Sequence, residues 1–167
     1  MSILTQPSNP NFLSPINFRF FMKRSPTLNF FATEANIPGI SIEVLKQTTP
    51  FIPISRPGNR LSHDLFDIKF KVDENFENYL EIFNWITALG MTNGFVGYQN
   101  LSKNSIITGE GVYTDGTLSI LDSAKNANMN VHFFDMFPVK LGSINFSTER
   151  EDVQYAECDV TFSYTKF

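Results

Sequence analysis

Residues 65–72 alternate apolar and polar side chains, and this pattern constrains the fold more than any other feature of the sequence. Phe66, Ile68, Phe70 and Val72 fall on one side of an extended chain, and Asp67, Lys69 and Lys71 fall on the other. A period of two residues is that of a β-strand with one buried and one solvated face. The pattern therefore predicts a sheet that packs one face on a hydrophobic core.

Other segments have the same extended character. They are residues 17–22, 28–33, 41–47, 117–122, 130–135, 137–146 and 153–167. The first two flank a proline-containing turn and are expected to pair as a hairpin. The phase of 137–146 slips at Gly142-Ser143, as a β-bulge would make it. The whole set predicts a mainly β fold, a β-sandwich or barrel of roughly seven or eight strands with one α-helix packed against it.

The length of 167 residues is typical of a single domain, and 42% hydrophobic residues suffice for a core. Residues 1–15 contain three prolines and no strand or helix period, so we predict an N-terminal arm. Residues 16–167 are predicted to form one β domain.

One helix is predicted from residue 75 to Leu89, capped by Asp73 or Asn75 and ended by Gly90. A helix on a single sheet needs one apolar arc of about 100°. This segment has two neighbouring apolar stripes, so we expect a second cover supplied by another subunit. The predicted subunit-interface residues are Phe76, Tyr79, Leu80, Ile82, Phe83, Trp85 and Ile86.

Residues 48–61 combine three prolines with the long apolar side chains of Phe51 and Ile54. Proline is excluded from central strands but tolerated at edges and in extended arms. A loop that need only stay soluble does not require these apolar side chains, so we interpret the stretch as a stiffened projection that packs on another molecule. A loop folded back onto its own domain is the alternative. The predicted arm residues are Thr49, Pro50, Phe51, Ile52, Pro53, Ile54, Arg56 and Pro57.

Residues 90–116 are rich in Gly, Asn and Ser. They are predicted to be a long loop, and a connection of this length is usually a functional or exposed excursion.

The sequence predicts no catalytic set, no metal site and no cofactor. A single cysteine, Cys158, excludes an internal disulfide framework and a multi-thiolate zinc site. His63 and His132 are the two histidines, and neither has carboxylate or nucleophile neighbours at a spacing that suits catalysis or ligation. Cys158 falls on the apolar face of its strand and is expected to be buried and inert. We therefore predict a protein that is not an enzyme.

The formal net charge of −4 argues against a general nucleic-acid binder, because phosphate binding rests on basic surface. Basic residues prevail in 1–60 and acidic residues in 61–167. If these parts form opposite surfaces, copies would meet head to tail and build rings or filaments; the alternative is that the fold mixes them. No apolar run is long enough for a membrane span, and the N-terminus lacks the order of a signal peptide, so a cytoplasmic product is expected.

Several sequence segments resemble those of the tail tube proteins of contractile-tailed bacteriophages. They are INFRF at 16–20, FATEANIPGI at 31–40, RPGNRL at 56–61, LFDIKFKVDE at 65–74, followed by the helix with Tyr79 and Trp85, and VTFSYT at 160–165. The resemblance implies a sandwich-like barrel, homo-hexameric rings that stack into a tube, and a channel through which DNA passes transiently. It also implies a hairpin that reaches the adjacent ring, placed at residues 48–61. The implied partners are other copies of the chain and the sheath, baseplate or neck proteins of the tail, with assembly in the host cytoplasm and residence in the virion tail.

Two alternatives stay open at this point. The same fold could serve a tube initiator or terminator, or a baseplate or neck adaptor. A different class is a ligand-binding β-sandwich whose site lies in residues 90–116, with Tyr98 and Tyr113 as the candidate aromatic platform.

Overall fold

The computed structural model describes residues 12–90, 95–108, 111–146 and 155–167, and the side chains of 104–108 are not included. Most of the predicted N-terminal arm, and the start of the predicted strand 153–167, lie outside these ranges. The strands are β1 (Phe18–Met22), β2 (Ala32–Ala35), β3 (Ile40–Gln47), β4 (Ile54–His63), β5 (Phe66–Lys71), β6 (Thr114–Leu121), β7 (Ala127–Leu141) and β8 (Glu157–Ser163). The helices are α1 (Pro26–Phe31), α2 (Glu77–Leu89) and α3 (Phe95–Thr108).

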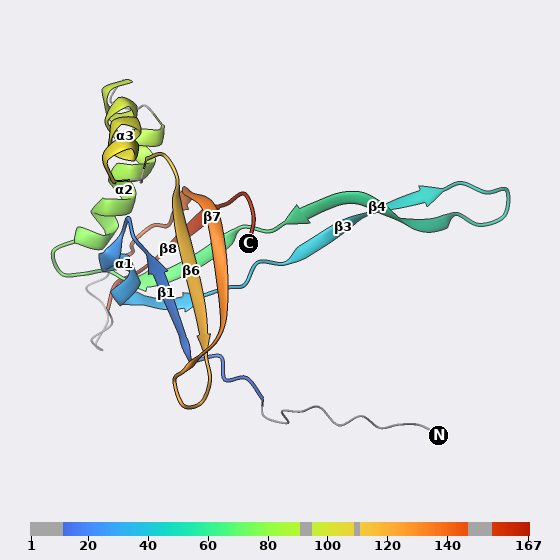
Figure 1. Cartoon of the computed structure of the whole chain (residues 1–167), viewed down its shortest axis with the longest axis horizontal. Coiled ribbons are helices and arrows are strands. Elements are labelled where there is room, and N and C mark those ends of the chain that lie inside the picture. Colours follow the sequence, from blue (N-terminus) through green and yellow to red (C-terminus); the bar gives the residue numbers. More distant parts are fainter. Residues whose placement is uncertain (1–11, 91–94, 109–110, 147–154) are drawn as a thin grey trace.

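Six strands form one antiparallel sheet in the order β1-β6-β7-β8-β5-β2, and β3 and β4 form a separate two-stranded hairpin. The long strand β7 serves two parts of the sheet, because its first part pairs with β6 and its end, from Phe137, pairs with β8. Asp135, at the junction, has a φ of 55°. The sheet changes direction along β7 and encloses the core, while α2 and α3 lie at one end of the body (Figure 1). The prediction of a mainly β, sandwich-like fold is confirmed.

The core consists largely of phenylalanine. The Phe66 ring stacks on Phe133 with centroids 4.3 Å apart and lies 5.5 Å from Phe20. These three rings come from β5, β7 and β1, so they join the two parts of the sheet. The alternation that predicted β5 is confirmed, because Phe66, Ile68 and Phe70 are fully buried.

The predicted pairing of residues 17–22 with 28–33 is wrong. Most of the second segment is α1, and β1 pairs with β6 instead. Pro26 occupies the first turn of α1, where its fixed φ suits a helix. The side chain of Asn29 then bonds the backbone of Met22, accepting from its N–H (2.8 Å) and donating to its carbonyl (2.7 Å). At the free edge of β1, the Asn29 side chain thus satisfies the Met22 backbone groups that a neighbouring strand would otherwise pair with.

The predicted loop 90–116 is also wrong, because it contains α3. This helix packs on α2, where a Cβ on Gly97 would lie 3.6 Å from the Ala88 Cα, and Leu101 is buried. Its polar sequence carries little helical pattern, so its packing on α2 rather than its periodicity stabilises it. None of the described helices is long and apolar enough to cross a bilayer.

Two smaller predictions need correction. The N-cap of α2 is Phe76, with a φ of 61°, and not Asp73 or Asn75. The register shift in the β7–β8 pair lies between Pro138 and Lys140, before the predicted bulge at 142–143, which follows the end of the strand. The predicted end of α2 is confirmed, since the Gly90 N–H bonds the Ile86 carbonyl.

Candidate assembly surfaces

The β3–β4 hairpin projects far from the body of the protein (Figure 1). Its strands pair from Ile40↔His63 at the root to Gln47↔Ile54 near the tip, with a register shift after Ile42. Gly58 lies at that irregularity, and a Cβ there would come within 2.8 Å of the Glu43 carbonyl oxygen. Only glycine therefore allows the two strands to approach this closely.

One face of the hairpin is apolar and uncovered. Ile42 lies opposite Leu61 and Val44 opposite Pro57. The side chains of Ile42, Val44 and Leu61 are 53–59% exposed. A lone two-stranded hairpin is at best marginally stable in water and needs a covering surface. Nothing in the described part of this chain supplies that cover.

The tip is ordered by its own side chains and ends in apolar groups. The Thr49 hydroxyl donates to the Ile52 carbonyl (2.5 Å) and accepts from the Ile52 N–H (3.2 Å). Phe51 and Ile52 stay 94% and 70% exposed. A local turn thus presents a large aromatic ring to the surroundings.

The root of the hairpin is held by the C-terminal segment. The Asp64 N–H bonds the Gly39 carbonyl (3.0 Å), and the Tyr164 hydroxyl donates to the Asp64 carbonyl (2.7 Å). The His63 ring packs edge-on against Phe167 with centroids 5.4 Å apart. These contacts fix the direction in which the hairpin leaves the body.

The structure places the predicted arm residues within a longer element. Residues 49–53 connect the strands, whereas Ile54, Arg56 and Pro57 belong to β4. The apolar residues of β3 and Leu61 were not among the predicted contact residues. Two extended segments on either side of a proline-rich turn were the signal that could have identified them.

The predicted interface helix presents two different faces. Ile82 and Trp85 are buried within the chain itself, and the Trp85 indole N–H donates to the Val112 carbonyl (3.2 Å). The Arg24 guanidinium lies 4.5 Å from the centre of the Trp85 ring. The cover of this stripe therefore comes from within the chain, and these two residues do not belong to an exposed surface.

The outer face of α2 is exposed. Phe76, Leu80 and Phe83 have 36–46% of their surface accessible. Tyr79 is half-buried and stacks on Phe83, with ring centroids 6.2 Å apart. The exposed Phe146 ring lies 6.4 Å from Phe76 and extends the patch. We call these five residues the α2 patch. Ile86, also predicted at an interface, is partly buried against the core.

The α2 patch has an acidic border. Glu74 and Glu77 are exposed beside its N-terminal end. Glu81 instead turns to α1, where it accepts hydrogen bonds from the Ser25 and Thr27 hydroxyls. No lysine or arginine occurs between Lys71 and Lys103 in the sequence. The patch therefore combines aromatic surface with two exposed carboxylates at its N-terminal end.

The remaining candidate groups do not form a chemical site. Within the described ranges, no group of three or more His, Cys, Asp or Glu side chains could hold a metal ion. Burial, with a smaller effect of Asp159, raises the pKa of the Cys158 thiol to about 11, so this thiol is protonated and unreactive near neutral pH. His132 is exposed, and its Nδ1 lies 3.0 Å from the Thr117 hydroxyl. Tyr98 stacks on Phe95 and Tyr113 packs against Phe137, so each has its own aromatic partner.

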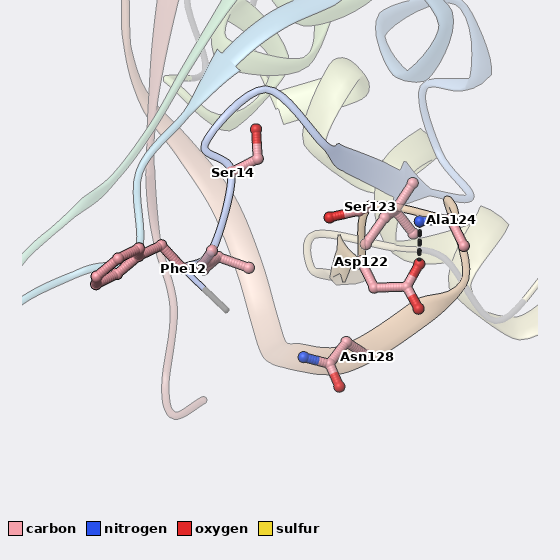
Figure 2. A pocket seen from close by; sticks show the side chains of 8 residues that line it. Phe12, Ser14, Asp122, Ser123, Ala124 and Asn128 are labelled. Carbon is pink, nitrogen blue, oxygen red and sulfur yellow. Dashed lines mark hydrogen bonds between the residues drawn. The ribbon is translucent and has the colours of Figure 1, made fainter. Parts of the chain in front are cut away.

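A hollow of about 300 Å³ lies between residues 12–14 and the β6–β7 turn. Asp122 uses one carboxylate oxygen to accept the Ala124 and Asn126 N–H groups, so that oxygen shapes the turn (Figure 2). Phe12 is almost fully exposed. The hollow is therefore an open feature of the surface rather than an enclosed ligand site.

Comparison with known proteins agrees with this geometry. The family model described as phage tail tube protein matches residues 11–167. The tail tube terminator protein of Enterobacteria phage T4 is 30% identical over 158 residues, which cover 90% of this chain and 85% of that protein.

Solved structures share the fold at low sequence identity. The tube-terminating cap of the anti-feeding prophage has a TM-score of 0.63, with 13% identity over 99% of this chain and 96% of the other. The sheath/tube terminator of an extracellular contractile injection system (PVC) has a TM-score of 0.62, with 18% identity over 95% and 96%. The family is one of structural tail proteins, so the prediction that the chain is not an enzyme is confirmed. The chain belongs to the phage tail tube protein family.

Proposed function

We propose that this protein is a tube terminator: it forms a ring that docks on the end of the tail tube and stops its growth. The observation that carries the proposal is the 30% identity to the T4 tail tube terminator, which extends along nearly the whole of both chains. A repeated tube subunit was the first expectation from the sequence, with a tube-end protein as its alternative. The relative supports the alternative.

The surfaces of the chain suit a ring. A copy leaves both the hairpin and the α2 patch uncovered, so association is required to bury them. One structure with this fold, at a TM-score of 0.62, comes from a baseplate that was symmetrised sixfold, which favours six copies. The hole of such a ring would continue the tube channel for the genome, and the acidic balance of the chain would keep DNA from adhering.

The position in the tail follows from the same argument. The ring would contact the last ring of tube subunits with one side and present its other side to sheath, baseplate or neck proteins. The protein would then be a component of the virion tail that assembles in the host cytoplasm.

Electron microscopy of the purified chain tests the ring, and tube polymerisation tests the terminator role. We expect rings with a central hole. Added to polymerising tube subunits of the same tail, they should cap the ends and shorten the tubes in proportion to their concentration. Co-polymerisation along the whole tube would instead identify a repeated subunit. Monomers that neither associate at high concentration nor bind tube ends would overturn the proposal.

A further inference from the structure

The two apolar surfaces that this chain leaves uncovered lie on opposite sides of the body. The hairpin extends from one side, and α2 lies on the other (Figure 1). A single copy therefore cannot cover its α2 patch with its own hairpin. We propose that the apolar face of the hairpin in one copy docks on the α2 patch of a second copy. This inference rests on the proposed ring and names the surface that receives the arm.

The shapes and chemistry of the two surfaces correspond. The hairpin offers a narrow strip of branched aliphatic side chains, represented by Ile42, Val44 and Leu61. The α2 patch offers aromatic rings around Leu80. Burial of both surfaces together removes apolar area from water, and this is the main favourable term in association. It also gives the hairpin the cover that a two-stranded ribbon needs.

Their charges are opposite. The hairpin carries Lys46, Arg56 and Arg60 against one carboxylate, that of Glu43. Among the described residues these three cations have no ion-pair partner. The border of the α2 patch carries Glu74 and Glu77. Opposite charges around an apolar contact select the correct partner and orientation and increase the rate of encounter.

The charges also disfavour the two symmetric alternatives. A hairpin paired with a hairpin through this face would bring Lys46 of both copies together, because Lys46 shares the face of Val44, and an α2 patch against an α2 patch would do the same with the glutamates. A hairpin-to-patch contact avoids both repulsions. Each copy then gives its hairpin to one neighbour and its patch to another, which is the head-to-tail arrangement that closes into a ring.

Charge reversal tests the pairing. We compare K46E/R56E, which reverses the cation on the face of Val44 and its neighbour across the hairpin, with E74K/E77K and with the chain that carries all four substitutions. Association is measured by sedimentation velocity and fold by circular dichroism. Each double reversal should weaken association about tenfold or more, and the fourfold variant should recover most of the loss, because the complementary charges are restored with the sides exchanged. K103E is the matched control on the exposed surface of α3 and should leave association unchanged.

Site-specific cross-linking provides a measurement that does not depend on charge. V44C and L80C are introduced in separate chains, mixed and oxidised; the buried native thiol of Cys158 does not compete. A disulfide-linked dimer in the mixture, absent from either variant alone, supports the contact.

The outcomes separate the two proposals. Failure of the wild-type chain to form rings would count against the ring itself. Wild-type rings that persist in every charge variant, with no cross-link between the two cysteines, would overturn the hairpin-to-patch contact and leave the ring in place. Loss of association in both double variants without recovery in the fourfold variant would also overturn it.

Discussion

Strands β3 and β5 have similar sequences but opposite environments. Both alternate apolar with polar residues, and both lie in antiparallel pairs. In β5, Phe66, Ile68 and Phe70 are fully buried, whereas every residue of β3 is exposed. The difference shows that alternation of apolar and polar residues identifies an apolar face of a strand. It does not show whether the same chain or another molecule covers that face. The body completes its own core, whereas the apolar side chains of the hairpin stay uncovered in a single copy.

The largest expected effect is on the body. Phe66→Ala removes a ring that contacts both Phe20 and Phe133, and should lower the free energy of unfolding by about 3–5 kcal/mol. The matched change Ile42→Ala on the hairpin should alter it by less than about 0.5 kcal/mol in the unassembled chain. Thermal unfolding measures both. Equal losses would show that the hairpin is covered within its own chain; if F66A does not fold, Ile68→Val gives a milder version of the same comparison.

The next effect concerns assembly rather than folding. Phe51→Asp with Ile54→Asp places two carboxylates at the apolar end of the arm, and we expect association to fall about a hundredfold because a charge cannot enter an apolar contact without loss of its hydration. Thermal stability of the monomer should not change. Ser55→Asp adds a charge to the same exposed strand without removing an apolar side chain and serves as the control. Unchanged assembly in the double variant would exclude a role for the tip.

A smaller effect is expected at the edge of β1. Asn29→Ala removes both hydrogen bonds to the Met22 backbone, and loss of these bonds should cost about 1–2 kcal/mol. The variant would also leave the body with an open strand edge like those of the hairpin, which promotes non-specific pairing. Hydrogen exchange at Met22 and light scattering measure the two consequences. Full protection of the Met22 amide in N29A would show that another group closes this edge.

Much of the body could be predicted from its residues. The alternation of β5 and the apolar residues of β8 are set by local patterning. Strand β5 lies within the predicted residues 65–72, and β8 occupies the middle of the predicted strand 153–167. The end of α2 at Gly90 likewise follows from local chemistry. These features depend only on neighbouring residues in the sequence and on the existence of a hydrophobic core.

The errors have a common cause. Residues 28–31 are helical because Pro26 starts the helix and the Asn29 side chain bonds Met22 of β1, and α3 is helical because it packs on α2. Both depend on contacts between one element and the next, which the apolar–polar periodicity of the segment itself does not record. The candidate surfaces divide in the same way: proline spacing predicted the arm, but only the fold separates buried Trp85 from exposed Phe83 on one helix.

The smallest expected effect concerns a buried thiol, which the body contains and the hairpin lacks. The body buries the Cys158 thiol, whose Sγ lies 3.4 Å from the Gly142 carbonyl oxygen, and the hairpin contains no cysteine. Burial first, and Asp159 second, raise the pKa of this thiol from 9.0 to about 11. Between about pH 9 and pH 11 the unfolded chain releases this proton and the folded chain keeps it, so the stability of the folded state falls as the pH rises.

Cys158→Ala should flatten that fall, measured as the difference in unfolding free energy between pH 8.5 and pH 10.5, roughly the interval over which the two states differ in bound protons. Burial and, less strongly, Asp64 also raise the pKa of Tyr164, which adds a loss of the same sign. Tyr164→Phe therefore serves as the second variant, and it isolates the contribution from the root of the hairpin. A C158A protein that loses stability as steeply as the wild type would show that the thiol is solvated in the folded state, and rapid labelling of Cys158 by a thiol reagent near neutral pH would show the same directly.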